Sequence, residues 1–443
     1  MKTTLLSFYL FGLVCLFTQA QATSYFVINL NDAGTGSLRE AITSANADAS
    51  ATDAAPHIIS FDIFNGGTIS LAASLPALNN HITIYGQAEQ ITISGGTGIR
   101  GFLINAGKTV LIHNLIICNG KLTNEFGGGI SNAGDLTLEY CTITANNISG
   151  ASSQGGGISN SGSGTINMTN CTVSDNISTN TGGGIVNYGS LNIVNSTIAN
   201  NNGLDGGGIA SYNGLIMINC TVTSNSGGGI YYVPGSGTVA LLNTISVGSA
   251  AGNDVYTSSA ATLISGYGLY GTVGASVTFN GSSNTTGSTK SAVFGTNVLA
   301  NNGGSTQTIA ILSTSPAVNT GTANTAPTLD QAGQSRSGLT DIGAFEYQPI
   351  PTATFTRLSE DLVTVYSNPG NGVFDMEIGE GIQGTYDWKV VDMKGKVLHN
   401  SGNIEKGNGA QMLQVNLSAQ TQGTYLLIIT TGKGIVNKSL VKL

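Results

Sequence analysis

The sequence predicts an all-β protein: a parallel β-helix with an N-terminal helical cap, followed by a small C-terminal β-sandwich. The chain of 443 residues contains 63 glycines but only 9% charged residues, whereas an average globular chain has about 7% glycine and roughly 25% charged residues. A Gly-Gly-Gly-Ile motif recurs five times along the middle of the chain, and similar segments of alternating apolar and polar residues follow its first four copies. That alternation is the period of a β-strand, and no helical period occurs in this region.

The repeat explains the composition. The glycine runs begin at Gly127, Gly155, Gly182, Gly206 and Gly227. The strand-like segments that follow begin at Leu136, Ile166, Leu191 and Leu215. One repeat unit is too short to enclose a core, but stacked units can enclose one. Each unit then forms one turn, or rung, of the β-helix, and its strands pair with the equivalent strands of the next rung about 4.8 Å away. Glycine permits tight corners, and like charges stacked at this spacing repel each other.

Two further positions of the repeat are polar or contain sulfur. Each strand-like segment carries a Cys or a Ser at one inward position, and an asparagine follows five residues later, at Asn146, Asn176, Asn201 and Asn225. Amides at such corners can stack and hydrogen-bond along the axis. One inward position holds Cys141, Cys171, Ser196 and Cys220, which we interpret as part of the core. Cys141 and Cys171 fall on adjacent rungs, so a disulfide between them is an alternative in an exported protein.

The arc between each of these asparagines and the next glycine run shortens along the chain. The variable segments comprise residues 147–154, 177–181, 202–205 and 226. We expect them to protrude from one face, because insertions in repeat proteins often form the binding surface.

Residues 99–248 resemble the pectin-lyase-like superfamily of right-handed parallel β-helices. Their Gly-Gly-Gly-Ile and Asn-Cys-Thr rhythm is similar to the repeats of polymorphic outer-membrane proteins. The resemblance implies a right-handed β-helix over residues 23–347. It does not imply one activity, because the superfamily includes lyases, hydrolases, esterases and adhesins.

Both ends of the stack need covers, because open strand edges invite aggregation. Residues 23–57 are expected to cap the first rung with a short helix, in which Ser37 and Glu40 fit a capping box. The apolar face of that helix comprises Leu38, Ala41, Ile42 and Ala45. Residues 301–347 resemble the "choice-of-anchor Q" segment of bacterial surface β-helices. We expect its charged residues to form an ion-pair and turn network that closes the last rungs: Asp330, Arg336, Asp341 and Glu346.

Residues 1–22 have the features of a secretory signal peptide. Lys2 precedes an apolar run over residues 5–17, and Ala20-Gln21-Ala22 is a small-residue cleavage site. The run is too short to span a bilayer, and no later stretch is long and apolar enough, so no transmembrane segment is expected in the mature chain.

The C-terminal region differs in composition. A linker over residues 348–358 precedes residues 359–443, whose alternating strands predict the β-sandwich. Its motifs resemble, in order, the type A C-terminal sorting domain of the type IX secretion system, which occurs in the Bacteroidetes. The motif residues are Tyr366, Asn368, Pro369, Asn371, Gly372, Gly395, Lys396, Gly423, Tyr425, Lys438 and Lys442. Ser367 departs from the family's usual Pro-Asn-Pro. The resemblance implies the type IX machinery as a partner and an extracellular or outer-membrane surface location.

The charge pattern bears on activity. A net charge of −8 argues against nucleic acid and anionic membranes as partners. No carboxylate ladder forms, because the positions equivalent to two acidic residues, Asp135 and Glu139, are neutral in the next rungs: Thr165 and Ser190, and Thr169 and Val194. The sequence therefore predicts no catalytic residue, no metal site and no cofactor.

Three tyrosines are candidates for glycan binding. Tyr188 and Tyr212 lie six residues after the start of their glycine runs, and Tyr232 lies one step off that register. Exposed aromatic stacks can hold sugar rings, while corner packing is the alternative. We expect a secreted or cell-surface β-helix protein without catalytic activity, in adhesion or in binding a polysaccharide or another cell surface. The alternative is a polysaccharide lyase or glycoside hydrolase of the same fold, which needs carboxylates and a basic residue gathered in one groove.

Overall fold

The chain folds into two compact units, one ending at Gln348 and the other beginning at Pro349. The computed structural model describes residues 22–87, 90–235, 237–336, 338–348, 357–392 and 396–443. The expected signal peptide lies outside these residues, apart from Ala22. Among the described helices, none is long and apolar enough to cross a membrane.

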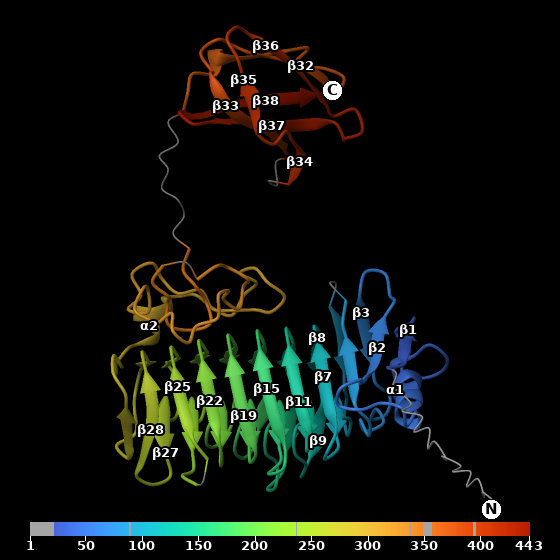
Figure 1. The fold of residues 1–443 in the computed structure, drawn as a ribbon, viewed down its shortest axis with the longest axis vertical. Coiled ribbons are helices and arrows are strands. Elements are labelled where there is room, and N and C mark those ends of the chain that lie inside the picture. The colour runs from blue at the N-terminus through green and yellow to red at the C-terminus, as the bar shows by residue number, and fades with distance from the viewer. Residues whose placement is uncertain (1–21, 88–89, 236, 337, 349–356, 393–395) are drawn as a thin grey trace, which may run out of the picture. The chain divides into compact units, whose positions relative to one another are not determined.

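Three long parallel sheets run through the first unit, and each of the central rungs contributes one strand to each sheet in turn (Figure 1). Sheet 1 comprises, in order, β1 (Ser24–Val27), β2 (His57–Phe61), β4 (Ile82–Tyr85), β7 (Thr109–His113), β11 (Asp135–Glu139), β15 (Thr165–Thr169), β19 (Ser190–Val194), β22 (Leu215–Ile218), β25 (Val239–Leu242), β28 (Ala261–Gly266) and β30 (Val277–Asn280). Sheet 2 comprises β6 (Phe102–Ile104), β10 (Ile130–Asn132), β14 (Ile158–Asn160), β18 (Ile185–Asn187), β21 (Ile209–Ser211), β24 (Ile230–Tyr232) and β27 (Val255–Thr257). Sheet 3 comprises β3 (Gly67–Ser70), β5 (Ile91–Ser94), β8 (Leu115–Cys118), β12 (Thr142–Thr144), β16 (Thr172–Ser174), β20 (Thr197–Ala199), β23 (Thr221–Thr223), β26 (Ile245–Val247) and β29 (Leu269–Tyr270). The predicted parallel β-helix is therefore confirmed.

A narrow fourth sheet runs along the variable arc of the rungs. It comprises β9 (Lys121–Thr123), β13 (Asn147–Ser149) and β17 (Ile177–Ser178), and single-residue bridges extend it through Asn202, Ser226 and Ala250. Part of each variable segment does not protrude but pairs with an adjacent rung, as Asn147 does with Lys121 and Ile177.

The register follows the repeat residue by residue. Leu136 pairs with Ile166, and Ile166 pairs with Leu191. These inward residues are almost completely buried. The two candidate carboxylates of sheet 1 have the neutral partners that the sequence predicted, since Asp135 pairs with Thr165 and Glu139 with Thr169.

Left-handed residues make the corners between sheets 1 and 3. At this corner successive rungs place Asn114, Tyr140, Asn170, Asn195, Asn219 and Asn243, with φ between 46° and 55°. Asparagine tolerates this conformation better than most residues with a side chain, which explains its recurrence.

The predicted asparagine ladder is present. Nδ2 of Asn146 donates to Oδ1 of Asn176 at 2.9 Å, and the pairs Asn176–Asn201 and Asn201–Asn225 repeat this bond at 3.0 Å. Each Oδ1 also accepts the backbone N–H of the preceding member, as Asn176 does from Asn146 at 3.0 Å. All four side chains are fully buried, so the ladder satisfies polar groups that water cannot reach.

A second buried amide ladder was not predicted. Asn132 donates to Asn160 at 2.9 Å, Asn160 to Asn187 at 2.8 Å, and Asn187 to Oγ of Ser211 at 3.0 Å. These residues end successive strands of sheet 2 and point inward.

The inward cysteines remain thiols. Cys118, Cys141, Cys171 and Cys220 are all free and buried. Each of the three ladder thiols donates to a carbonyl of the preceding rung, as Cys141 Sγ does to Ile112 O at 3.3 Å. Burial raises the pKa of Cys220 to about 12. The core interpretation is therefore supported, and the structure contains no Cys141–Cys171 disulfide.

Helix α1 (Leu38–Ala47) covers the first rung, as predicted (Figure 1). The Ser37 hydroxyl accepts from the Glu40 backbone N–H at 3.2 Å, and Leu38, Ala41, Ile42 and Ala45 are buried. The Glu40 carboxylate reaches back to the N–H of Gly36 at 2.5 Å, one residue before the helix cap.

The segment after the last rung lies along the side of the stack. After α2 (Lys290–Phe294), residues 295–336 and 338–348 cross the outer face of sheet 3, seen in gold and orange in Figure 1. Gln331 anchors this crossing by accepting from Thr197 Oγ1 at 2.7 Å and donating to Cys171 O at 3.1 Å. The expectation that residues 301–347 close the last rungs was wrong. The physical reason is the burial of apolar side chains. Outward residues of sheet 3, including Ala199, Ile245 and Val247, form a second hydrophobic core with Phe294, Ile309, Ile311 and Ile342.

The second unit is an antiparallel sandwich around its own core. One sheet comprises β31 (Val363–Tyr366), β32 (Val373–Ile378) and β36 (Gln411–Asn416), and the 3-10 helix η1 (Glu360–Leu362) precedes it. The other comprises β33 (Gly384–Val391), β34 (Val397–Asn400), β35 (Ile404–Lys406), β37 (Gly423–Thr431) and β38 (Gly434–Lys442). Buried residues from both sheets form one cluster that includes Phe374, Val415, Tyr386, Leu427 and Val436. The all-β fold is confirmed in this unit as well.

The asparagine ladder yields a stability prediction. Asn176→Ala removes the acceptor of two fully buried Asn146 N–H donors, so the free energy of unfolding of the β-helix should fall by about 2–4 kcal/mol. Denaturant titration followed by circular dichroism measures this. Asn192→Ala is the matched control, because its bond to Asn167 is exposed, and it should cost less than about 0.5 kcal/mol. Equal costs for the two variants would contradict the role of the ladder.

Candidate functional site

Four tyrosines line the outside of sheet 2 and are called the tyrosine strip: Tyr188, Tyr212, Tyr231 and Tyr256. The rings of Tyr188 and Tyr212 stack with centroids 4.6 Å apart and planes at 18°. Those of Tyr231 and Tyr256 stack at 4.7 Å and 27°. All four side chains are half-buried. Successive rungs thus supply one ring each.

Tyr232 does not belong to the strip, so its candidacy for glycan binding is corrected. It is 5% exposed and points into the core, where its hydroxyl donates to Gly237 O at 3.0 Å. Its register partner is the inward Ser211, whereas Tyr231 is the residue of β24 that faces outward. Alternation within β24 was the signal that could have identified Tyr231, whereas counting from the glycine run selected the wrong neighbour.

Hydrogen bonds hold the strip to the glycine corners. The Tyr188 hydroxyl bonds to Gln154 Oε1. The Tyr256 hydroxyl accepts from Gly206 N at 2.7 Å and donates to Gly227 O at 2.9 Å. A Cβ at Gly228 would lie 2.5 Å from Cε1 of Tyr256, so glycine is required where this ring rests on the backbone.

Three phenols of the strip have a raised pKa. Burial raises the pKa of Tyr188, and burial followed by the nearby Asp205 carboxylate raises that of Tyr231. The same burial raises the pKa of Tyr256 further. Flat apolar rings with protonated hydroxyl tips are chemically suited to sugar rings and their hydroxyls.

The charged residues of the segment over sheet 3 do meet, but in a buried site. Arg336 pairs with Glu346 at 2.8 Å, and their side chains are 1% and 6% exposed. Arg336 also donates to Gly343 O at 2.8 Å. The Asp330 and Asp341 carboxylates accept backbone N–H groups, including Glu346 N at 2.7 Å and Asn319 N at 2.7 Å.

This cluster has the composition of a lyase or glycosidase site but not its accessibility. Burial raises the pKa of Asp330, Asp341 and Glu346, and lowers that of Arg336. The Asp330 and Asp341 carboxylates accept from the backbone of their own segment, and Arg336 donates to Asn195 Oδ1 of the β-helix at 3.2 Å. The cluster therefore fixes this segment and ties it to the β-helix. Among the described residues, no group of three or more His, Cys, Asp or Glu could hold a metal ion.

A hollow of about 590 Å³ lies beside sheet 4. Its lining includes Lys121, Glu125, Asn147 and Ser149, where the variable segments are longest. Glu125 is paired with Arg100 at 3.1 Å. The hollow therefore offers one paired carboxylate rather than the two that a glycosidase uses.

In the second unit, the fold brings the first and last sorting motifs together. Asn368 accepts from Val441 N at 2.8 Å and donates to Ser439 O at 2.5 Å. Gly372, with φ of 102°, lies where a Cβ would meet the Lys442 side chain at 3.0 Å. Lys442 Nζ donates to Ser418 O at 2.8 Å.

The other motif residues hold turns and strand ends. Tyr366 donates to Glu377 at 2.5 Å, and Asn371 accepts from Val373 N at 3.3 Å. Tyr425 is buried and donates to Thr421 O at 2.6 Å. Pro369 follows Asn368 in the same turn, Lys396 N donates to Asp392 at 2.9 Å, and Gly423 and Lys438 lie on β37 and β38. Gly395 lies outside the described residues.

Comparison with known families agrees with this arrangement. Residues 364–442 match the family described as the secretion system C-terminal sorting domain. No curated protein matches the chain significantly. The β-helix and the sorting domain together define a secreted or cell-surface protein that the type IX secretion system handles.

Removing Arg336 should destabilise the β-helix in a pH-dependent way. Arg336→Met leaves buried carboxylates without their cation, so the free energy of unfolding should fall by about 3–5 kcal/mol near neutral pH. Carboxylates with a raised pKa bind more protons in the folded state, so the deficit should shrink as pH falls and grow as pH rises. Urea unfolding of both proteins at several pH values below and above neutrality measures this deficit. Arg357→Met is the control, because its pair with Glu360 is exposed. A small, pH-independent deficit would contradict the proposed role.

Deleting residues 359–443 should block export. In a host with type IX secretion, the truncated β-helix should accumulate in the periplasm while the full chain reaches the surface or medium, as measured by fractionation and immunoblotting. The deletion leaves the compact first unit intact, so circular dichroism of the truncated protein controls for folding. Normal export of the truncated chain would refute the requirement for the sorting domain.

Proposed function

We propose that the exported β-helix binds a linear, neutral polysaccharide along the tyrosine strip and thereby attaches the protein to a glycan surface. The stacked, half-buried pairs Tyr188–Tyr212 and Tyr231–Tyr256 are the observation that carries this proposal. Each ring is supplied by its own rung, and the rings follow the axis of the β-helix in two neighbouring columns. Tyr231 pairs in register with Ala210, two residues before Tyr212, so the Tyr231–Tyr256 column lies beside the Tyr188–Tyr212 column.

The spacing of the rungs supports a linear glycan. Paired strands lie about 4.8 Å apart, which is close to the length of one pyranose residue in an extended chain. A polysaccharide lying along the axis would therefore present one sugar to each rung. Such repetition suits a regular polymer better than a branched or folded ligand.

The electrostatics support a neutral ligand. The strip consists of tyrosine rings and hydroxyls, with Gln154 and the carboxylate of Asp205 beside it. No Lys or Arg is among the partners that hold the tyrosines, so a polyuronate would meet Asp205 without a compensating cation. The burial of the Arg336 cluster supports binding rather than cleavage as the role of the fold.

The test is affinity electrophoresis and calorimetry of the chain lacking residues 1–22 against neutral and acidic polysaccharides. Tyr212→Ala with Tyr231→Ala should weaken the Kd for a neutral polysaccharide about tenfold or more. These two are chosen because Tyr188 and Tyr256 hold the corners of the fold. Tyr366→Ala, an exposed tyrosine of the other unit, is the control and should bind normally.

Three outcomes would overturn the proposal. They are unchanged affinity in the double variant with an unchanged melting temperature, no neutral polysaccharide bound by the unmodified chain, or release of sugars or unsaturated products from the panel. The last outcome would favour the lyase or glycosidase alternative.

A further inference from the structure

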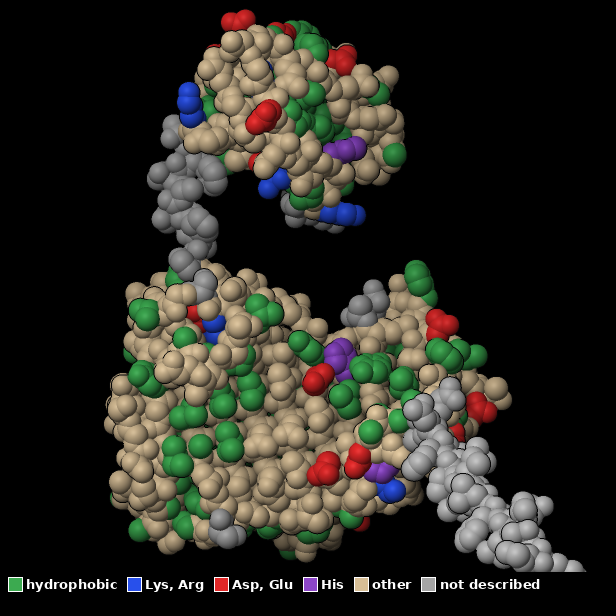
Figure 2. Space-filling view, viewed as in Figure 1, with side chains coloured by type: hydrophobic (Ala, Val, Ile, Leu, Met, Phe, Trp, Pro, Cys, Tyr) green, Lys and Arg blue, Asp and Glu red, His purple; other side chains and the backbone are tan. Residues whose placement is uncertain are grey.

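A groove lies where the tip of the segment over sheet 3 meets the N-terminal rungs. Its volume is about 340 Å³, within the range of ligand pockets. The helix contributes Gln90, Ile116, Thr142 and Thr144, and the segment contributes Asn301 and Ser305 among others. Figure 2 shows this face hollowed between the lobe of that segment and the N-terminal lobe.

The two walls of the groove are tied together. Gln90 Nε2 donates to Asn114 Oδ1 at 3.1 Å on one wall and to Ser305 O at 2.8 Å on the other. Thr306 Oγ1 donates to Asn170 O at 2.8 Å. The groove is therefore preformed, and a ligand would not have to order it on binding.

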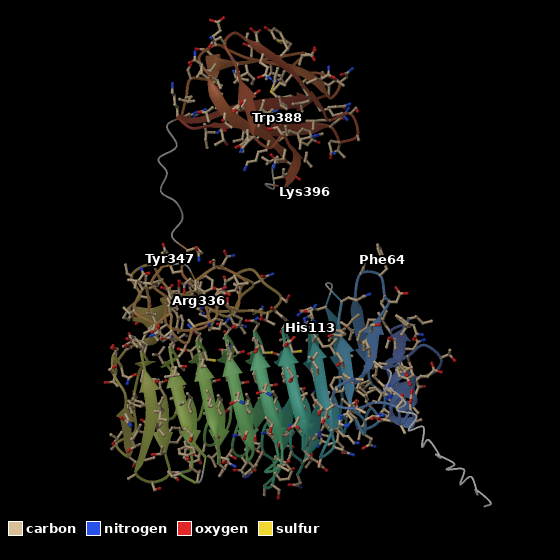
Figure 3. The ribbon with its side chains drawn as sticks, in the orientation of Figure 1. Phe64, His113, Arg336, Tyr347, Trp388 and Lys396 are labelled. Carbon is tan, nitrogen blue, oxygen red and sulfur yellow. The ribbon has the colours of Figure 1, made fainter. Side chains whose placement is uncertain are left out.

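An aromatic row runs along the rungs next to the groove: Tyr85, His113 and Tyr140. Ring centroids lie 5.7 Å apart for Tyr85–His113 and 5.3 Å apart for His113–Tyr140, with planes at 59° in both pairs. The row itself does not line the groove but lies across the corner from it. His113 precedes Asn114, which accepts from Gln90 of the groove, and Tyr140 lies two residues before Thr142. Gln90 links the corner next to His113, which is labelled in Figure 3, to the segment over sheet 3, because it bonds to both Asn114 and Ser305.

Two features of the row are unusual for the repeat. Tyr140 has φ of 54° at a corner where the neighbouring rungs place Asn114 and Asn170. A bulky residue in this conformation is strained, and such strain tends to persist at functional sites. In addition, the buried Nδ1 of His113 has no hydrogen-bond partner among the described residues.

The chemistry of the groove is neutral and polar. Its lining supplies hydroxyls and amides, with Ile116 as the apolar member. Glu139, paired in register with His113, is the carboxylate of the adjoining row. Tilted rings leave parts of their faces open, and Tyr85 is 42% exposed. Hydroxyl and amide groups beside open ring faces fit the two surfaces of a pyranose.

We infer that this groove is a second carbohydrate site, which takes a short stretch or an end of a neutral oligosaccharide. Sugar faces would pack on the aromatic row, and sugar hydroxyls would bond to Thr142, Thr144 and Asn301. The site shares no residue with the tyrosine strip and lies on other sheets, so it goes beyond the proposed function and does not depend on it.

The experiment titrates the chain lacking residues 1–22 with neutral gluco-, manno- and xylo-oligosaccharides, followed by calorimetry and saturation-transfer NMR. Tyr85→Ala combined with Thr142→Val should weaken the Kd of the bound oligosaccharide about tenfold. Val keeps the shape of Thr while removing its hydroxyl, and Thr137→Val on the neighbouring sheet 1 strand is the matched control. Tyr212→Ala with Tyr231→Ala should leave this affinity unchanged.

The outcomes separate the two sites. Loss of oligosaccharide affinity in the groove variant alone supports the inference. This result does not depend on whether the tyrosine strip binds a polysaccharide. Unchanged affinity in the groove variant, loss only in the strip variant, or no binding of any neutral oligosaccharide would overturn it. Melting temperatures of the variants exclude unfolding as the cause, and Thr142→Val alone provides a milder variant if the double substitution unfolds.

Discussion

In-register pairing of successive rungs is the constraint on which the rest of the β-helix depends. Each side chain contacts the equivalent side chains of the rungs on either side. A residue type can therefore recur at one position only if two copies of it can pack or hydrogen-bond with each other at that spacing. Asparagine meets this requirement because its amide both donates and accepts, which allows the ladders from Asn146 to Asn225 and from Asn132 to Asn187. A carboxylate or an ammonium group cannot do so, because its neighbour at rung spacing would repel it.

The two candidate surfaces arise where the sequence departs from that repetition. Half of the strip arises because Tyr231 and Tyr256 occupy the outward position that holds the small residue Ala210 in the preceding rung. At the groove, Tyr140 replaces a corner asparagine, and Gln90 joins the rungs to a segment 215 residues away. The ladders give a rigid frame, and these exceptions provide the chemically distinctive surfaces.

Much of the fold could be predicted because the repeat encodes it locally. The pairing of Asp135 with Thr165, the Ser37 cap and the corner asparagines all follow from short motifs. The path of residues 295–348 did not, because its cause lies in outward apolar residues such as Ile245 and Val247, where other rungs carry Ile116, Thr142 or Ser174. Of the candidate site, the Tyr188–Tyr212 pair could be found from spacing. Tyr231, Tyr256 and the groove needed strand register and contacts between distant segments.

The two aromatic surfaces differ in what they leave open to a ligand. In each stacked pair of the strip, one face of each ring is occupied by its partner, so edges and outer faces remain, repeated along the axis. In the row beside the groove, rings tilted by 59° cover less of each other, and polar walls stand next to them. The strip is therefore suited to many weak contacts with a long polymer, whose combined strength grows with the number of rungs engaged. The groove is suited to fewer, more complete contacts with a short saccharide. Both surfaces lie on the same β-helix, which the hydrogen-bonded amide ladders hold rigid. A saccharide that binds one surface would therefore not need to change the conformation of the other.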